Sequence, residues 1–192
     1  MKKTFPNSLM AFFANAVLCC TIFFASCTGP TCDTPSNRLG NINVDANVFM
    51  GGPTGSCPFP GGQPFINAVN TGTSAFASVK AGNPASYIPE IIVSGTCPSG
   101  KGWTEVIRQG QISLTALPNN RVRFSFNPAV TSNNEYTVIV RVFTPCVNGS
   151  CAGITNYREI LSPDGFKIPN PTAGSTYLAP KLLSGVAEES CQ

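Results

Sequence analysis

The amino-acid sequence predicts an all-β protein: a single antiparallel β-sandwich, cross-linked by disulfides and preceded by an N-terminal signal helix. Three observations support this fold class. Apolar and polar residues alternate with a period of two along most of the chain after residue 40. The 18 glycines and 17 prolines fall largely between these runs, where turns require them. Nine cysteines in 192 residues are typical of exported domains stabilised by disulfides.

Three runs show the alternation most clearly. The run EYTVIVRVF, residues 135–143, is apolar on much of both faces, which predicts a strand in the middle of a sheet. The runs QISLTAL (111–117) and NRVRFSF (120–126) have one apolar face each, so we expect their other face in solvent. Further strand candidates are INVDANVFM (42–50), PFINAV (64–69), SAFASVK (74–80), YIPEIIVS (87–94), WTEVIRQ (103–109) and ITNYREIL (154–161).

The predicted domain spans residues 40–192 and ends in an irregular tail from about residue 163. Pro89 lacks an N–H, which places the first half of its strand at an edge or a bend. Outside the signal no run keeps a helical stripe for ten residues. Only LAPKLLSGVAEES (178–190) is compatible with a helical turn. Short strands spaced about ten residues apart indicate one β-sandwich.

The first 26 residues have the layout of a bacterial export signal. Two lysines follow Met1, and the apolar run LMAFFANAVLCCTIFFAS leads to Cys27. The segment FASC, residues 24–27, resembles the lipobox of bacterial lipoproteins, with Phe24 in place of the usual leucine. The resemblance implies that the signal peptide (1–26) is removed, that Cys27 carries palmitate-type lipid, and that residues 27–39 are a lipid-anchored tether. Soluble secretion and an uncleaved membrane anchor are the alternatives.

Cysteine parity agrees with lipid at Cys27. Once Cys19 and Cys20 leave with the signal and Cys27 is modified, an even number remains, which allows three disulfides. The disulfide candidates are Cys32, Cys57, Cys97, Cys146, Cys151 and Cys191.

The spacing suggests how these cysteines pair. Cys146 and Cys151 flank Asn148-Gly149, a dipeptide that favours a tight hairpin turn, so we expect a disulfide across that hairpin. The simplest remaining pairs are Cys32 with Cys191, at the ends of the domain, and Cys57 with Cys97, in two Gly/Pro turns. Other connectivities stay open.

The segment FNPAVTSNNEYTVIVRVFT, residues 126–144, resembles the region around strands E and F of fibronectin type III and immunoglobulin-like domains. In those families a loop precedes a tyrosine that opens a strand of alternating apolar residues. The resemblance implies that Tyr136 is a structural tyrosine-corner residue whose hydroxyl bonds to upstream backbone. It carries no activity with it.

The composition disfavours catalysis and metal binding. The chain has no histidine, which removes the commonest general base and every Ser-His or Cys-His nucleophile. Glu90 and Glu105 are better explained as charges on a sheet surface than as a glycosidase pair. With no histidine and no cysteines at two-residue spacing, we expect no metal and no cofactor.

Neither nucleic acid nor nucleotide is an expected partner. The chain has a formal net charge of +3, the signal carries two of the lysines, and no basic cluster follows. The stretch GTCPSGKG, residues 95–102, is close to a phosphate-binding loop, but Gly102 replaces the Ser or Thr that would bind magnesium. Pro98 removes an N–H, and a strand is expected afterwards instead of a helix. We therefore expect a strand–turn–strand connection with Lys101 in solvent.

Four aromatic residues near predicted turns are candidates for stacking on a glycan or anchoring a protein partner. They are Phe59, Phe65, Trp103 and Tyr157. The alternative is that each fills an end of the core.

Together these features predict a non-catalytic, lipid-anchored envelope or surface protein that serves as an interaction or structural module, with a protein partner in the envelope. The alternative is a carbohydrate- or peptide-binding module or an adhesin-like subunit of a surface assembly. Thr28, instead of aspartate, follows Cys27. By resemblance to proteobacterial lipoproteins, this implies the outer membrane.

Overall fold

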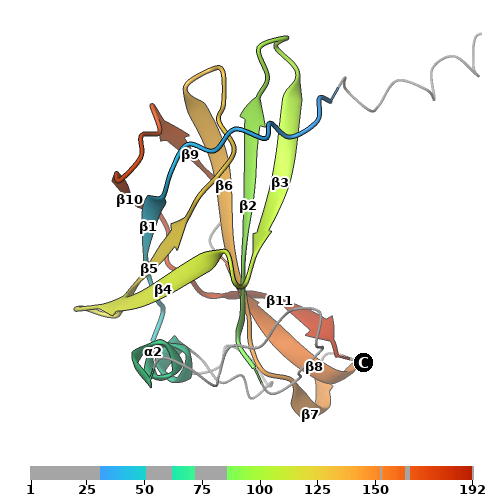
Figure 1. Cartoon of the computed structure of the whole chain (residues 1–192). Coiled ribbons are helices and arrows are strands. Elements are labelled where there is room, and N and C mark those ends of the chain that lie inside the picture. Colours follow the sequence, from blue (N-terminus) through green and yellow to red (C-terminus); the bar gives the residue numbers. More distant parts are fainter. Residues whose placement is uncertain (1–30, 51–61, 72–85, 152, 163–164, 192) are drawn as a thin grey trace, which may run out of the picture.

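The computed structural model describes residues 31–50, 62–71, 86–151, 153–162 and 165–191 (Figure 1). Within them the protein is mostly β-structure organised in sheets, as the sequence predicts. In chain order the elements are β1 (Ile42–Asn47), α2 (Gly62–Thr71), β2 (Ile88–Thr96), β3 (Gly102–Arg108), β4 (Ile112–Leu117), β5 (Arg121–Phe126), β6 (Glu135–Phe143), β7 (Val147–Cys151), β8 (Ile154–Leu161), β9 (Phe166–Pro169), β10 (Thr176–Leu178) and β11 (Gly185–Ser190).

The strands form two sheets. The smaller has the order β10-β1-β5-β4, and the larger has the order β11-β8-β6-β2-β3, with β7 beside β8 and β9 beside β6. Strand β10 runs parallel to β1, whereas the other pairs of named strands are antiparallel. The run 135–143, expected to be central, is β6 and lies between β8 and β2.

Inward-facing side chains of both sheets form one hydrophobic cluster. In β6, Tyr136, Val138 and Val140 are fully buried, while the residues between them are exposed or half-buried. In β5, Val122 and Phe124 are fully buried and the intervening arginines are half-buried. The period-two pattern therefore predicted the inward face of β5 correctly, whereas the run of β6, which is apolar on much of both faces, predicted only its central position.

At Pro89, strand β2 has a paired neighbouring strand on one side only. Pro89 pairs with Val142 of β6, but β3 ends at Arg108, which lies opposite Glu90. At Pro89 strand β2 is thus an edge on its β3 side. This is the environment expected for a proline within a strand.

The segment 64–69, expected to be a strand, belongs to the helix α2 instead. Pro64 lies in the first turn, where a missing N–H breaks no helical bond. The buried residues Phe65, Ile66, Ala68 and Val69 share one helical face, which packs toward β4 and β5. A six-residue apolar run cannot distinguish the two periods, which explains the error. The other strand candidate in this region, residues 74–80, lies outside the described residues.

The region after residue 163 is not an irregular tail. It contains β9, β10 and β11, and the expected helical turn at 178–190 is occupied by the end of β10 and by β11. Each of these short strands pairs with a strand that precedes it in the chain: β9 with β6, β10 with β1 and β11 with β8. Long-range pairing stabilises them, so their own sequence carries only a weak signal.

Asn148-Gly149 does not form the expected turn. Both residues lie within β7, where the pairing with β8 shifts register between Val147 and Ser150. The pairing is irregular at this point, and Gly149 lies within the irregular segment with a φ of 154°. The chain reverses later, between the end of β7 at Cys151 and the start of β8 at Ile154.

Candidate functional site

The end of the β2–β3 hairpin has a tight, fully bonded turn. The amide of Cys97 donates to the carbonyl of Lys101 at 2.8 Å, and that of Gly100 donates to Cys97 at 2.9 Å. Gly100 has a φ of 79°, which favours glycine. Lys101 is exposed, and strand β3 begins immediately after it. The expected strand–turn–strand connection is confirmed.

Residues 31–39, called the strap here, begin beside the free edge of β3 and end beside the loop before β6. The amide of Cys32 donates to the carbonyl of Gly102 at 3.0 Å, and the Thr34 hydroxyl donates to that of Thr104 at 3.2 Å. At its far end the amide of Leu39 donates to the carbonyl of Pro128 at 3.0 Å. This part of the expected tether is therefore held against the domain and covers an edge strand.

An ion pair fastens the strap to the core side of β3. Glu105 lies opposite the buried Val93 of β2, and its side chain is 10% exposed. One carboxylate oxygen accepts a hydrogen bond from Arg38 Nη1 at 2.6 Å, and the other accepts one from the Ala129 amide at 2.7 Å. The carboxylate thus joins the strap, β3 and the loop before β6. Charge-assisted bonds of this kind are the stronger ones in proteins.

The disulfides differ from the expected pairs. Cys32 is bonded to Cys97, and Cys146 is bonded to Cys191. The expected pairs Cys146–Cys151, Cys32–Cys191 and Cys57–Cys97 are therefore wrong. The strap brings Cys32 to the hairpin turn, and β11 runs antiparallel to β8, which brings Cys191 close to the start of β7. Cys57 lies outside the described residues.

Gly95 and Trp103 form a cross-strand pair behind this turn. The indole lies so close to the Gly95 backbone that a Cβ there would be 2.4 Å from Cζ2 of Trp103. The ring also meets Tyr136 edge-on, with centroids 6.1 Å apart. The absence of a side chain at position 95 is thus what lets Trp103, only 2% exposed, enter the core.

We expect Gly95→Ala to lower the free energy of unfolding by about 1–3 kcal/mol, because the added methyl group overpacks the core. Gly102→Ala is the matched control. A Cβ at position 102 would have its nearest neighbour at 3.9 Å, so we expect little change. Urea denaturation followed by tryptophan fluorescence measures both variants. Equal stability of the two variants would contradict the packing described here.

The Tyr136 hydroxyl donates a hydrogen bond to the carbonyl of Ala129, seven residues upstream. This is the bond that the resemblance to tyrosine corners implies. Together with the Glu105 carboxylate, it holds the Ala129 peptide at both its N–H and its C=O. Burial raises the pKa of Tyr136 from 10.0 to about 12.

We expect the protein to lose stability as the pH rises through the range from 10.0 to about 12. The folded state favours the neutral phenols of Tyr136 and Tyr87, whose pKa values burial raises, so their contribution is complete below pH 10 and then declines. Tyr136→Phe should cost about 1–3 kcal/mol at neutral pH, because a buried carbonyl loses its donor. The variant should also show a shallower alkaline loss. Urea titrations across this pH range test both statements, and parallel curves would disprove the assignment to Tyr136.

The predicted binding aromatics are core residues wherever the structure describes them. Phe65 is 0% exposed, Tyr157 1% and Trp103 2%. Phe65 and Trp103 belong to the main hydrophobic cluster, whereas Tyr157 packs with Val147 and Ile154 in a small separate cluster. At these exposures none of the three presents a free ring face for stacking, although Trp103 is among the residues that line the groove described next. Phe59 and Cys27 lie outside the described residues.

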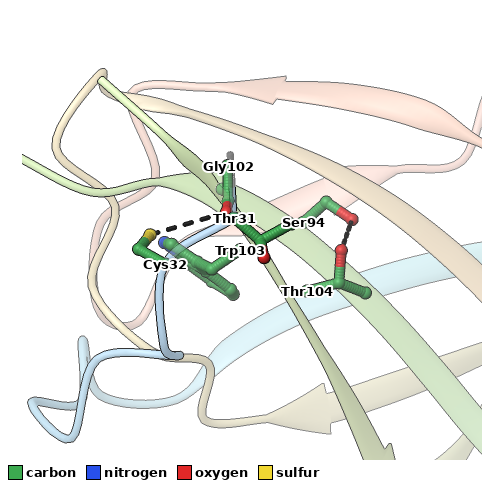
Figure 2. A pocket seen from close by; sticks show the side chains of 7 residues that line it. Thr31, Cys32, Ser94, Gly102, Trp103 and Thr104 are labelled. Carbon is green, nitrogen blue, oxygen red and sulfur yellow. Dashed lines mark hydrogen bonds between the residues drawn. The ribbon is translucent and has the colours of Figure 1, made fainter. Parts of the chain in front are cut away.

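A shallow groove lies beside the strap and the hairpin (Figure 2). Its volume is about 450 Å³, and its lining residues are Thr31, Cys32, Ser94, Gly95, Gly102, Trp103 and Thr104. The hydroxyls of Ser94 and Thr104 bond to each other at 2.9 Å, as Figure 2 shows. Among the described residues that line the groove, none has a titratable side chain.

The two candidate carboxylates do not form a catalytic pair. Glu90 lies opposite Arg108, with 3.8 Å to Nε of Arg108 and 3.8 Å to Nη1 of Arg141. Glu105 lies three positions further along the register and faces the core side. Each is engaged by arginine. Within the described part of the chain, no three Cys, Asp or Glu side chains gather as metal ligands.

Comparison with protein-family models, curated proteins and solved structures finds no significant match to this chain. Among the residues that the structure describes, no helix has the length and hydropathy needed to cross a bilayer.

The roles of the groups that build this end of the domain were not predicted from the sequence. Arg38 stands in no motif, Glu105 was interpreted only as a charge on a sheet surface, and Gly95 only as the first residue of the loop at 95–102. The available signal for Glu105 was its position, since it interrupts the apolar alternation between Trp103 and Ile107. A buried charge on the core side of an edge strand needs a partner of opposite charge, which for Glu105 means a lysine or an arginine. The structure shows that this partner is Arg38.

Proposed function

We propose that this protein is a lipid-anchored component of the bacterial cell envelope, stationed at the outer membrane, which acts without catalysis as an interaction or structural module. The sequence FASC at residues 24–27, after an apolar export signal, supports lipid attachment at Cys27. Two disulfides that join residues 65 and 45 positions apart support an oxidising, extracytoplasmic compartment.

The pairing of the cysteines is the strongest support for lipid attachment at Cys27. Four of the cysteines downstream of Cys27 are used in the two disulfides. The other two, Cys57 and Cys151, are again an even number. Cys27 is then the odd cysteine of the mature chain, as it must be if its sulfur carries a lipid.

We further propose that the two sheets form an immunoglobulin-like β-sandwich. Inward residues of both sheets belong to one core cluster, and the Tyr136 bond to Ala129 has the connectivity of a tyrosine corner. The domain is then a scaffold whose surface binds a partner. The engagement of Glu90 and Glu105 by arginines supports the non-catalytic role.

Metabolic labelling with a palmitate analogue tests the anchor. The wild-type protein should incorporate the label, and Cys27→Ser should not. Thr28→Ser is the matched control, because it alters the neighbouring residue and keeps the thiol. Equal labelling of wild type and Cys27→Ser would refute the lipoprotein proposal.

A second candidate function is that of a subunit in a surface assembly. Strand β4, with sequence ISLTAL, has no charged residue and forms the end of the smaller sheet. It pairs only with β5 among the strands that the structure describes. Its inward residues Ile112, Leu114 and Ala116 pack on the core but stay half-exposed. Uncharged edges of this kind accept an added strand.

Sedimentation velocity distinguishes this candidate. If β4 mediates assembly, Thr115→Lys should reduce self-association, because a lysine on an edge strand blocks strand addition. Thr104→Lys, on the edge that the strap covers, serves as the control. A protein that is monomeric at every concentration would argue against self-assembly through β4.

A further inference from the structure

Resting on the lipid anchor proposed above, we propose that the β2–β3 hairpin end of the domain lies on the headgroups of the bilayer. The Cys32–Cys97 disulfide determines this orientation, because it joins the strap to the hairpin turn only five residues after Cys27. The opposite end, with α2 and the β7–β8 hairpin, then faces away from the membrane (Figure 1).

The number of residues between Cys27 and Cys32 limits the distance between the lipid and the hairpin turn. Five residues from Cys27 to Cys32 span at most about 18 Å when fully extended. The Cα atoms of Cys32 and Cys97 are 6.6 Å apart, so the hairpin turn lies close to the N-terminal end of the strap. A lipid attached at Cys27 therefore holds this turn near the membrane surface.

The strap would have to break several contacts with the domain before its residues could add to the length of the tether. Beyond the disulfide, it is held by the Cys32 amide on Gly102, by the Thr34 hydroxyl on Thr104 and by the Arg38–Glu105 ion pair. In Figure 1 the strap crosses the sheet near the hairpin tip and far from α2. Lipid and hairpin tip thus lie at the same end of the molecule.

The chemistry of the tip suits a headgroup surface. The residues from Pro98 to Lys101 are all exposed, and none of them has a large apolar side chain. The tip therefore has nothing to insert into hydrocarbon. Lys101 adds one positive charge facing anionic phosphate groups, a weak attraction beside the anchor itself. The contact is thus set by the tether, and the charge contributes little.

Energy transfer to a headgroup-labelled lipid tests this orientation. The full lipidated chain is reconstituted in vesicles of phosphatidylethanolamine and phosphatidylglycerol. A fluorescent amino acid replaces either Ser99, at the exposed tip, or Asn70, on the exposed face of α2. We expect transfer from position 99 to be several times that from position 70. Equal transfer, or greater transfer from position 70, would overturn the proposal.

Two variants separate the tether from other causes. A Gly-Ser linker of about 20 residues inserted after Thr28 lengthens the tether without altering the domain, so the difference between the two positions should shrink. Lys101→Gln should leave the difference intact. Loss of the difference in Lys101→Gln, or its persistence with the linker, would contradict a tether-set orientation.

The experiment can disprove the lipid anchor and the orientation of the domain independently of each other. If Cys27→Ser binds the vesicles as well as wild type does, the proposed lipid anchor is wrong. If binding needs Cys27 but the two positions show equal transfer, the anchor stands and the orientation is wrong.

Discussion

Trp103→Ala is expected to lower the free energy of unfolding by about 3–5 kcal/mol, the range for truncation of a large buried aromatic residue. Trp103 is 2% exposed, covers Gly95 and meets the Tyr136 ring edge-on. Its removal leaves a cavity between β2, β3 and β6, which other side chains fill only in part. Urea denaturation followed by circular dichroism measures the change, since the variant lacks the only tryptophan.

Two further substitutions make this test specific. Val106→Ala, on the opposite face of the same strand and 38% exposed, should change stability by less than about 0.5 kcal/mol. Trp103→Phe should cost less than Trp103→Ala. It keeps a ring in the core and removes Nε1, a buried donor that has no acceptor within the described structure. A loss in Trp103→Ala no larger than in Val106→Ala would show that Trp103 is not a core residue.

Removal of the Cys32–Cys97 disulfide is expected to have a comparable effect. The bond closes a loop with a sequence separation of 65 residues. Chain entropy for a loop of this length predicts about 4 kcal/mol, and measured losses for native disulfides are typically about 2–5 kcal/mol. The Cys32→Ser/Cys97→Ser double variant avoids a leftover thiol. Thermal unfolding should therefore show a clear fall in Tm.

The control for this variant lies in the strap itself. Ser36 is exposed, so Ser36→Ala should leave the Tm unchanged. In the double variant, the strap should also exchange its amide hydrogens faster, because it keeps only hydrogen bonds and the Arg38–Glu105 pair. An unchanged Tm together with unchanged exchange would contradict the role of this disulfide.

The strands with a clear period of two were predictable from the sequence. In β5, alternation alone identifies the buried face, because a half-buried strand places every second side chain in the core. In β6, apolar residues on both faces predict the central position of the strand but not which face is inward. The helix α2 was not predictable in this way. Its PFINAV segment is too short to separate a period of two from one of 3.6, and Pro64 is equally compatible with a strand end and a helix start.

The aromatic residues and the disulfides depend on long-range packing. A tryptophan near a turn can stack on a ligand or fill a core, and what decides here is Gly95, on the neighbouring strand. The partner of Cys32 depends on where the strap lies, which in turn depends on an ion pair between residues 67 positions apart. The spacing of residues along the chain shows neither the position of Gly95 beside Trp103 nor the position of the strap. The disulfide pairs expected from that spacing were therefore wrong.

Lipid attachment at Cys27 can be measured as the intact mass of the mature protein, extracted from the membrane fraction of its native host. We expect a chain that begins at Cys27, carries the mass of a diacylglycerol and an amide-linked acyl group, and lacks two hydrogens for each disulfide. A chain that begins at Cys27 or later without added lipid, or one that retains residues 1–26, would show that the protein is not a lipoprotein.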